Sequence, residues 1–312
     1  MSLQKPLTLP EDQKIDSAGV WNLPMSRYHS DICDRPSISS SGLRTIWTQS
    51  PAHYFYESPY NPNRPEDEDE RPHFSIGRAA HHLLFLGRKG FDEEFATRPE
   101  QWSDWRSKDA KLWREDAIAR GLTVITENDL ELIAGMARSL AAHPMVKAGI
   151  LDGYVERSLI WKEPGADGVW LKSRPDCIPN DSGDFSDLKT CVSVGTDELR
   201  KHIASFGYHM QGALAGMACK RVLDREMQSF TLVFVEKSPP HCVRVVTLRP
   251  EDLVRGENQI RAAVDMFAAS VASGSWPGPG GDHGDAEFLD LPEYARKSID
   301  HRLETIAQLE PA

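Results

Sequence analysis

The stretch Ser173–Cys191, SRPDCIPNDSGDFSDLKTC, decides the fold because it brings two acidic residues and a lysine close together. Side chains alternate between the faces of a strand, so an extended Asp184–Cys191 points Asp187 and Lys189 the same way. The intervening sequence PNDSG is typical of a turn and would return this strand toward Asp176, just after a proline. The stretch therefore predicts a hairpin in which two carboxylates and one ammonium group share a pocket.

Two converging carboxylates form a hard, oxygen-rich site of the kind that Mg²⁺ or Mn²⁺ prefers. A neighbouring lysine can hold or help deprotonate a water molecule and can offset charge that develops on a phosphate. The residue types thus indicate metal-assisted cleavage of a phosphodiester bond.

A helix is expected over the sequence HFSIGRAAHHLLFLGR, in which Gly77 and His81 lie four residues apart on one face. Glycine costs about 1 kcal/mol relative to alanine inside a helix, which suggests that another backbone approaches closely there. His81 and His82 are by default an ordinary histidine pair, so their spacing alone leaves a metal-binding role open.

Further strands are predicted from runs of β-branched and aromatic residues, and they would complete a mixed sheet. These strands are Tyr154–Trp161, Val169–Arg174, Ser229–Glu236 and Cys242–Leu248.

Two helices are expected to flank this sheet near the hairpin. Four serines precede a helix that ends near Ser50. Residues 196–223 predict one long helix whose buried stripe includes Phe206, while Tyr208 and Gln211 lie on another face.

The composition indicates a globular chain, with 312 residues of which 40% are hydrophobic. No run of about 18 apolar residues and no apolar leader is present, so neither a membrane span nor a secretory signal is expected. The five cysteines are scattered, without a C-x-x-C pair, as in a cytoplasmic protein with reduced thiols. The net charge of −11 argues against a generally basic DNA-coating protein, so DNA binding would need a local basic lining.

The sequence divides into three expected parts. Residues 1–36 form an irregular N-terminal arm, and residues 274–312 form a linker and a C-terminal helix. Between them, 37–273 form a single domain, with a helical part over 37–150 and the sheet with its helices over 151–273. The acidic run Glu66–Glu70 is expected to face away from any nucleic acid.

Pro175-Asp176 followed by Asp187-Leu188-Lys189 resembles the PD-(D/E)XK nuclease superfamily. Within it, the chain resembles the RecE-like branch, which is related to RecB-type and lambda-exonuclease-type nucleases. The elements that carry this resemblance, in the same order, are the serine-capped helix, Gly77 with His81, the strand around Glu156, the two acidic elements, and Tyr208 with Gln211. One departure is Ala215, which stands where the more general Q-x-x-x-Y pattern has a tyrosine.

The resemblance implies an α/β restriction-endonuclease-like core, in which helices flank a central mixed sheet and a helical region precedes it. It also implies a Mg²⁺-dependent exodeoxyribonuclease of bacterial or prophage origin, with Mn²⁺ able to substitute. Such an enzyme degrades one strand of linear duplex DNA from the 5′ end and leaves a 3′ single strand for recombination.

The resemblance further assigns roles to individual residues. The expected metal ligands are His81, Asp176, Asp187 and the backbone carbonyl of Leu188. Lys189 would position the attacking water, and Glu156, Tyr208 and Gln211 would support the water, the metal or the phosphate. Ser41 and Arg44 would hold a DNA phosphate, and Arg174 would neutralise a carboxylate or contact phosphate.

The partners implied by the resemblance are double-stranded DNA ends, a single-strand annealing protein of the RecT type and further copies of the chain in a ring. A closed ring would place the negatively charged surface of the chain on the outside, away from DNA inside the ring. Two alternatives stay open. One is an endonuclease or helicase-associated nuclease, and the other is a non-catalytic, DNA-end-binding recombination protein.

Overall fold

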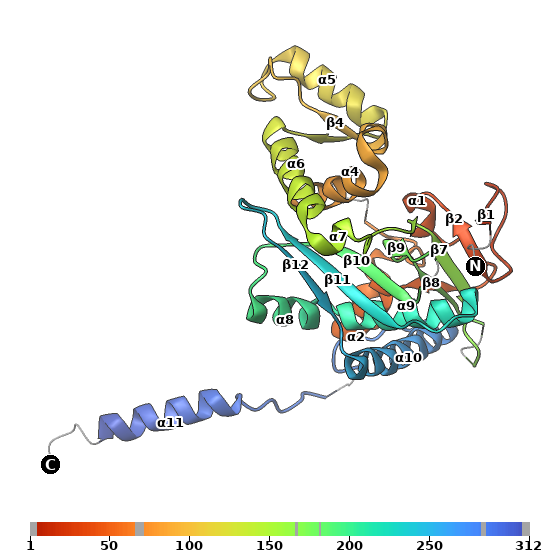
Figure 1. Ribbon diagram of the computed structural model, residues 1–312. Helices are drawn as coiled ribbons and strands as arrows, with labels where there is room; N and C mark the ends of the chain where they lie inside the picture. Colours follow the sequence, from red (N-terminus) through yellow and green to blue (C-terminus); the bar gives the residue numbers. More distant parts are fainter. Residues whose placement is uncertain (1–4, 66–71, 166–167, 181, 282–284, 308–312) are drawn as a thin grey trace.

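The computed structural model describes residues 5–65, 72–165, 168–180, 182–281 and 285–307, so Glu66–Glu70 lies outside the described residues. The chain forms two five-stranded mixed sheets with helices around them (Figure 1). The predicted α/β class, with mixed sheets flanked by helices, is confirmed, but the strands divide between two sheets instead of forming one. None of the described helices is long and apolar enough to cross a bilayer.

The first sheet has the strand order β1-β2-β7-β8-β3, and the second has the order β12-β11-β10-β9-β6. The strands of the first sheet are β1 (Leu7–Thr8), β2 (Gly19–Asn22), β3 (Ser37–Ser39), β7 (Ser158–Lys162) and β8 (Trp170–Ser173). The strands of the second sheet are β6 (Tyr154–Val155), β9 (Cys177–Ile178), β10 (Asp184–Cys191), β11 (Ser229–Glu236) and β12 (Val243–Thr247). A separate pair is formed by β4 (Phe95–Thr97) and β5 (Thr123–Ile125).

Helices cover both faces of the second sheet. The described helices of the chain are α1 (Met25–Tyr28), α2 (Ser40–Thr48), α3 (Pro51–Glu57), α4 (Pro72–Glu94), α5 (Lys108–Ala119), α6 (Glu127–Ala142), α7 (Pro144–Lys147), α8 (Thr196–Ser205), α9 (Tyr208–Leu223), α10 (Pro250–Ser273) and α11 (Glu293–Ala307), of which α4, α6, α9 and α10 pack on this sheet. Along β11, Leu232 and Phe234 pack in the core formed with α9 and α10, whereas Val233 and Val235 pack against α4 and α6. Because both faces are buried, this strand is a continuous apolar run.

Residues 5–36 are largely irregular, as expected, but they are part of the folded body and do not form a separate arm. Strand β2 pairs antiparallel with β7, and β3 begins at Ser37 beside β8. Ile15 is completely buried and Trp21 is 7% exposed. Prolines, aspartates and serines separate the apolar residues, so the sequence shows no periodicity, yet Ile15, Trp21, Leu23 and Ile32 pack in the same small core.

A buried lysine fastens this segment to the first sheet. Lys172 of β8 is 3% exposed, and its Nζ donates hydrogen bonds to the carbonyl oxygens of Tyr28, at 2.8 Å, and Ser30, at 3.2 Å. Burial lowers the pKa of Lys172 to about 8, against the opposing charges of Cys33 and Asp31. The ammonium group is therefore harder to keep charged in the folded protein than in the unfolded chain.

The free energy of unfolding should consequently depend on the charge of Lys172. Above the folded-state pKa the unfolded chain still binds the proton that the folded protein has released, so stability rises with pH. From about pH 8 to pH 10, we expect the free energy of unfolding of the wild type to rise by about 2 kcal/mol more than that of Lys172→Met. Urea unfolding of both proteins at these two pH values measures the gain. An identical pH dependence in the two proteins would show that the lysine does not titrate in this window.

The predicted long helix over 196–223 is two helices. Gly207 takes a left-handed backbone with φ of 62°, which ends α8 and starts α9 in a new direction. Phe206, predicted to be buried, is 49% exposed at this break. The apolar spacing continues across the break, so periodicity alone could not reveal it.

Candidate active site

The predicted site residues gather where the chain passes twice from one sheet to the other. The first passage joins β6 to β7 at Glu156, and the second joins β8 to β9 through residues 174–176. Glu156 was expected within a continuous strand, but it has a left-handed backbone with φ of 53° and interrupts that strand. Its backbone N–H donates to the carbonyl oxygen of Asp176 at 3.3 Å. The two passages therefore hold these two acidic residues next to each other.

Asp176 lies beside a part of β10 that has no described strand partner on that side. The short strand β9 pairs with β10 only at Cys177 opposite Ser186. Beyond that point, the Leu188 N–H donates to Asp176 Oδ2 at 2.8 Å in place of a strand partner. The N–H and C=O of one strand residue point to the same edge, so the Leu188 carbonyl also faces this opening.

The predicted alternation along β10 is confirmed by the contacts of Asp187 and Lys189. Asp187 is fully buried, and its Oδ1 accepts a hydrogen bond from Gln211 Nε2 of α9 at 2.8 Å. Its Oδ2 forms an ion pair with Lys189 Nζ. The same Nζ lies 5.1 Å from the ring centroid of Tyr208, also on α9. The helix that follows the hairpin thus orients both members of the pair.

Helix α4 brings His81 to the other side of the acidic group. His81 Nε2 lies 3.1 Å from Asp176 Oδ1, and Nδ1 lies 3.7 Å from Glu156 Oε1. Glycine at position 77 allows this approach, because a Cβ there would lie 3.1 Å from Thr190 Oγ1 of β10. The close contact expected at Gly77 is therefore made with a side chain and not with another backbone.

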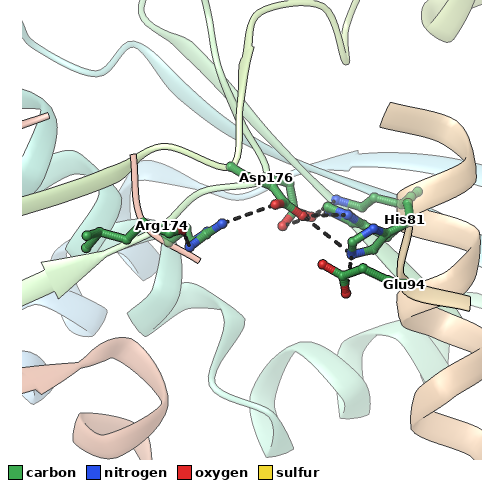
Figure 2. A network of polar contacts seen from close by, with 8 residues as sticks. His81, Glu94, Arg174 and Asp176 are labelled. Atoms are coloured by element: carbon green, nitrogen blue, oxygen red, sulfur yellow. Dashed lines mark hydrogen bonds and ion pairs between the residues drawn. The ribbon is translucent and has the colours of Figure 1, made fainter. Parts of the chain in front are cut away.

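Arg174 holds Glu156 from the opposite direction. Its NH2 group lies 3.1 Å from Glu156 Oε2, and its NH1 group donates to the Leu23 carbonyl at 2.9 Å. Figure 2 shows Arg174 and His81 on opposite sides of the acidic group around Asp176. Arg174 thus makes an ion pair with a carboxylate, which is one of the two roles expected for it, and its contact with a phosphate stays a prediction.

The charges of the site strongly influence one another. Burial and the neighbouring Asp176 raise the pKa of Asp187 to about 6. Although burial opposes its ionisation, Asp176 has a pKa below its usual range because His81 and Lys189 stabilise its charge. Despite their own burial, His81 and Lys189 have raised pKa values because both carboxylates attract positive charge. The centre therefore favours bound positive charge.

The residues present fit a divalent metal ion. Among the described residues, no three His, Cys, Asp or Glu side chains are already arranged as a metal-binding group. However, His81 Nε2 and Asp187 Oδ2 are buried and, within the described chain, make no hydrogen bond of ordinary geometry. Two carboxylates, one imidazole and the outward-facing Leu188 carbonyl are suitable donors for Mg²⁺ or Mn²⁺.

A cleft of about 1430 Å³ opens over this centre. Among the described residues that line it, basic side chains outnumber acidic ones. The basic residues are Arg44, Arg78, Arg157, Arg174, Lys189 and Lys237, and the acidic ones are Glu94, Glu156 and Asp176. This is the local basic lining that DNA binding would require in a chain with a net charge of −11.

Arg44 and Ser41 have different positions relative to the cleft. Arg44 lines it, and its NH1 group donates to the carbonyl of Phe206 at 2.5 Å. Ser41 is exposed and its hydroxyl lies 3.0 Å from that of Ser39. Ser41 is not among the lining residues described, and contact of either residue with DNA stays a prediction.

Sequence reasoning missed two parts of the site. One is the wall that the N-terminal segment contributes through Leu23, Met25 and Tyr28. The other is the contact of His82 Nε2 with Glu94 Oε2, at 3.7 Å. The wall has no local signal because it depends on how a distant segment packs, and the contact of His82 with Glu94 depends on the break at Gly87 inside α4, where φ is 66°. The apolar residues of the N-terminal segment were the one available hint that it belongs to the body.

The family comparison agrees with this geometry. A model for a family described as a PDDEXK-like domain of unknown function, DUF3799, matches residues 39–289. Among curated proteins, none matches this sequence.

Solved structures resemble the fold at low sequence identity. A protein from Eubacterium rectale, provisionally described as an exonuclease, is similar with a TM-score of 0.57 and 14% identity over 89% of this chain and 98% of its own. A phage-related exonuclease from Haemophilus somnus has a TM-score of 0.31 and 11% identity over 77% of this chain and 96% of its own. The first likeness shows the fold, and the second is too weak to add to it.

Proposed function

Because the chain belongs to this PDDEXK-like family of unknown function, DUF3799, we propose that it is a metal-dependent nuclease that hydrolyses DNA. More narrowly, we propose an exonuclease that degrades linear duplex DNA in the 5′ to 3′ direction and leaves a 3′ single strand. The convergence of Asp176, Asp187 and Lys189 at an open strand edge carries this proposal. The basic lining of the cleft above them supports a polyanionic substrate.

Each residue of the centre has a distinct proposed task. Asp176, Asp187, the Leu188 carbonyl and His81 would hold Mg²⁺ or Mn²⁺. When bound, the ion would supply a Lewis acid for the scissile phosphate and its attacking and leaving oxygens.

The remaining residues orient the reactants. Lys189, as a compact donor with a raised pKa, would position the attacking water and stabilise negative charge. Gln211 fixes the Asp187 carboxylate through a direct hydrogen bond, and Tyr208 lies beside the ammonium group. Arg174 forms an ion pair with Glu156 beside the proposed metal position, and Arg44 lines the cleft wall, where it would contact a phosphate.

Purified protein incubated with Mg²⁺ and either linear or covalently closed duplex DNA tests the proposal. We expect degradation of linear DNA alone, with products labelled at the 5′ end released first. Nicking of closed circles would indicate an endonuclease instead. Binding of ends without any hydrolysis would indicate a non-catalytic recombination protein.

His81→Ala should raise the Mg²⁺ concentration needed for half-maximal hydrolysis by about tenfold or more, because it removes one proposed ligand. His53→Ala is the control for loss of an imidazole, since His53 is exposed, contacts Ser50 and is not among the lining residues of the cleft. A Mg²⁺ titration of both variants measures the effect. If His81→Ala titrates as the wild type does, the imidazole is not a ligand.

We also propose the wider biology that such an exonuclease would serve. It would act in the cytoplasm with a single-strand annealing protein of the RecT type and assemble as a homo-oligomeric ring. All five cysteines are free thiols, which supports the compartment. Helix α11 extends away from the body with Ile299, Leu303 and Ile306 exposed along it, which supports assembly with other copies (Figure 1).

A further inference from the structure

Phe206 presents an aromatic side chain to the cleft. It stands at the break between α8 and α9 with 49% of its surface exposed. Its neighbours His202 and Tyr208 line the same cleft. Burying apolar area gains about 25 cal/mol per Å², so a ligand in the cleft that covered this ring would gain free energy from the contact.

Contacts of both the backbone and the side chain hold Phe206 in place. The Phe206 carbonyl accepts a hydrogen bond from Arg44 NH1 at 2.5 Å, and the Phe206 N–H donates to the His202 carbonyl at 3.0 Å. The ring lies nearly parallel to that of Tyr208, with centroids 5.7 Å apart and an angle of 15°. The His202 ring meets it edge-on at 4.8 Å. A platform ordered beforehand loses little conformational entropy when it binds a ligand.

These rings connect the open cleft to the reactive centre. Tyr208 lies between Phe206 and Lys189, since its ring contacts the first and its centroid is 5.1 Å from the Nζ of the second. Arg44, which fixes the Phe206 carbonyl, also lines the cleft and can attract a phosphate. A nucleotide bound here would have its phosphate near the cations and its base near the ring.

We propose that Phe206 is a stacking platform for an unpaired nucleobase next to the phosphate under attack. The inference rests on the proposed nuclease function and adds that the end of the cut strand leaves the duplex stack before hydrolysis. Every base has a π-face, so stacking on an aromatic side chain is tolerant of sequence. Phe206 would therefore bind ends of any sequence.

A cycle that removes the base and the ring separately tests this pairing. The substrates are four linear duplexes, each with a single abasic site at one of the first four positions of the cut strand, and an intact duplex for comparison. For the wild type we expect kcat/KM to fall about tenfold at one of these positions, as loss of one stacked base implies. Phe206→Ala should lose about tenfold on intact DNA and show no further loss at that position.

Three variants control for structure. Phe206→Trp should stay within about threefold of the wild type because it keeps a ring, and Phe206→Leu should behave like Phe206→Ala because it keeps bulk alone. Tyr56→Ala removes another exposed aromatic side chain, 60% exposed and not among the lining residues, and should change nothing. Thermal unfolding confirms that each variant is folded.

The outcomes separate the two proposals. The stacking role is wrong if an abasic site lowers kcat/KM by the same factor in Phe206→Ala as in the wild type, or if Phe206→Leu is fully active. Either result would leave the nuclease function standing. A wild type that hydrolyses no duplex would overturn the nuclease itself. Should Phe206→Ala unfold, fluorescence of 2-aminopurine placed near the end decides. Quenching by the wild type without metal, but not by Phe206→Leu, supports stacking, and equal quenching by both refutes it.

Discussion

Asp187→Asn should abolish DNA hydrolysis while the protein stays folded. The substitution keeps the size of the side chain but removes the carboxylate that pairs with Lys189 and would hold metal. We expect kcat to fall by about 10³-fold or more, the range seen when a group that stabilises developing charge is removed. Initial rates on linear duplex DNA at saturating Mg²⁺ measure the loss.

The same variant should still unfold in one cooperative transition without metal, at a lower temperature than the wild type. The amide relieves the repulsion between Asp187 and Asp176, but it leaves the buried Lys189 without the carboxylate that pairs with it directly. Asp184→Asn is the matched control, because this exposed aspartate begins the same strand and bonds to Ser229 instead. Rates within threefold or so of the wild type are expected for that control. Substantial hydrolysis by Asp187→Asn would remove this carboxylate from the mechanism.

Lys189→Met should cause a comparable loss of activity. Its ammonium group pairs with Asp187, is attracted by Asp176 and lies beside the Tyr208 ring. We expect kcat to fall by about 10²–10⁴-fold with DNA affinity nearly unchanged, because the charge acts on the reacting phosphate. Single-turnover hydrolysis and binding of DNA ends without metal separate these two effects.

Lys237→Met is the matched control for charge in the cleft. Lys237 also lines the cleft, but Lys237→Met should weaken DNA binding and reduce the salt dependence of that binding. The single-turnover rate should change little. Lys189→Arg tests geometry, since a guanidinium is larger and does not deprotonate. A Lys189→Met enzyme that keeps a tenth of the wild-type rate would contradict the assigned role.

The hairpin was predictable because its information is local. A turn sequence joins two short extended segments, and strand alternation alone places Asp187 and Lys189 on one face. The position of His81 was harder, because helix spacing gives a face but not what the face meets. Only the resemblance to a known family connected that helix with the acidic residues.

The departures from prediction have a common physical origin. The breaks at Glu156 and Gly207 are single backbone rotations into the left-handed region, and neither disturbs the apolar pattern around it. The N-terminal segment similarly carries isolated apolar residues that become ordered only against the first sheet. Tertiary packing decides such features, so a reading of spacing and composition places them wrongly.

The most direct test of the account is anomalous diffraction from crystals soaked in Mn²⁺. The account predicts a peak in contact with the Asp176 and Asp187 carboxylates and the Leu188 carbonyl, with the His81 imidazole beside it, at roughly 2.1–2.3 Å from its ligands. A peak elsewhere, or none while both carboxylates stay paired with Lys189 and His81, would contradict it.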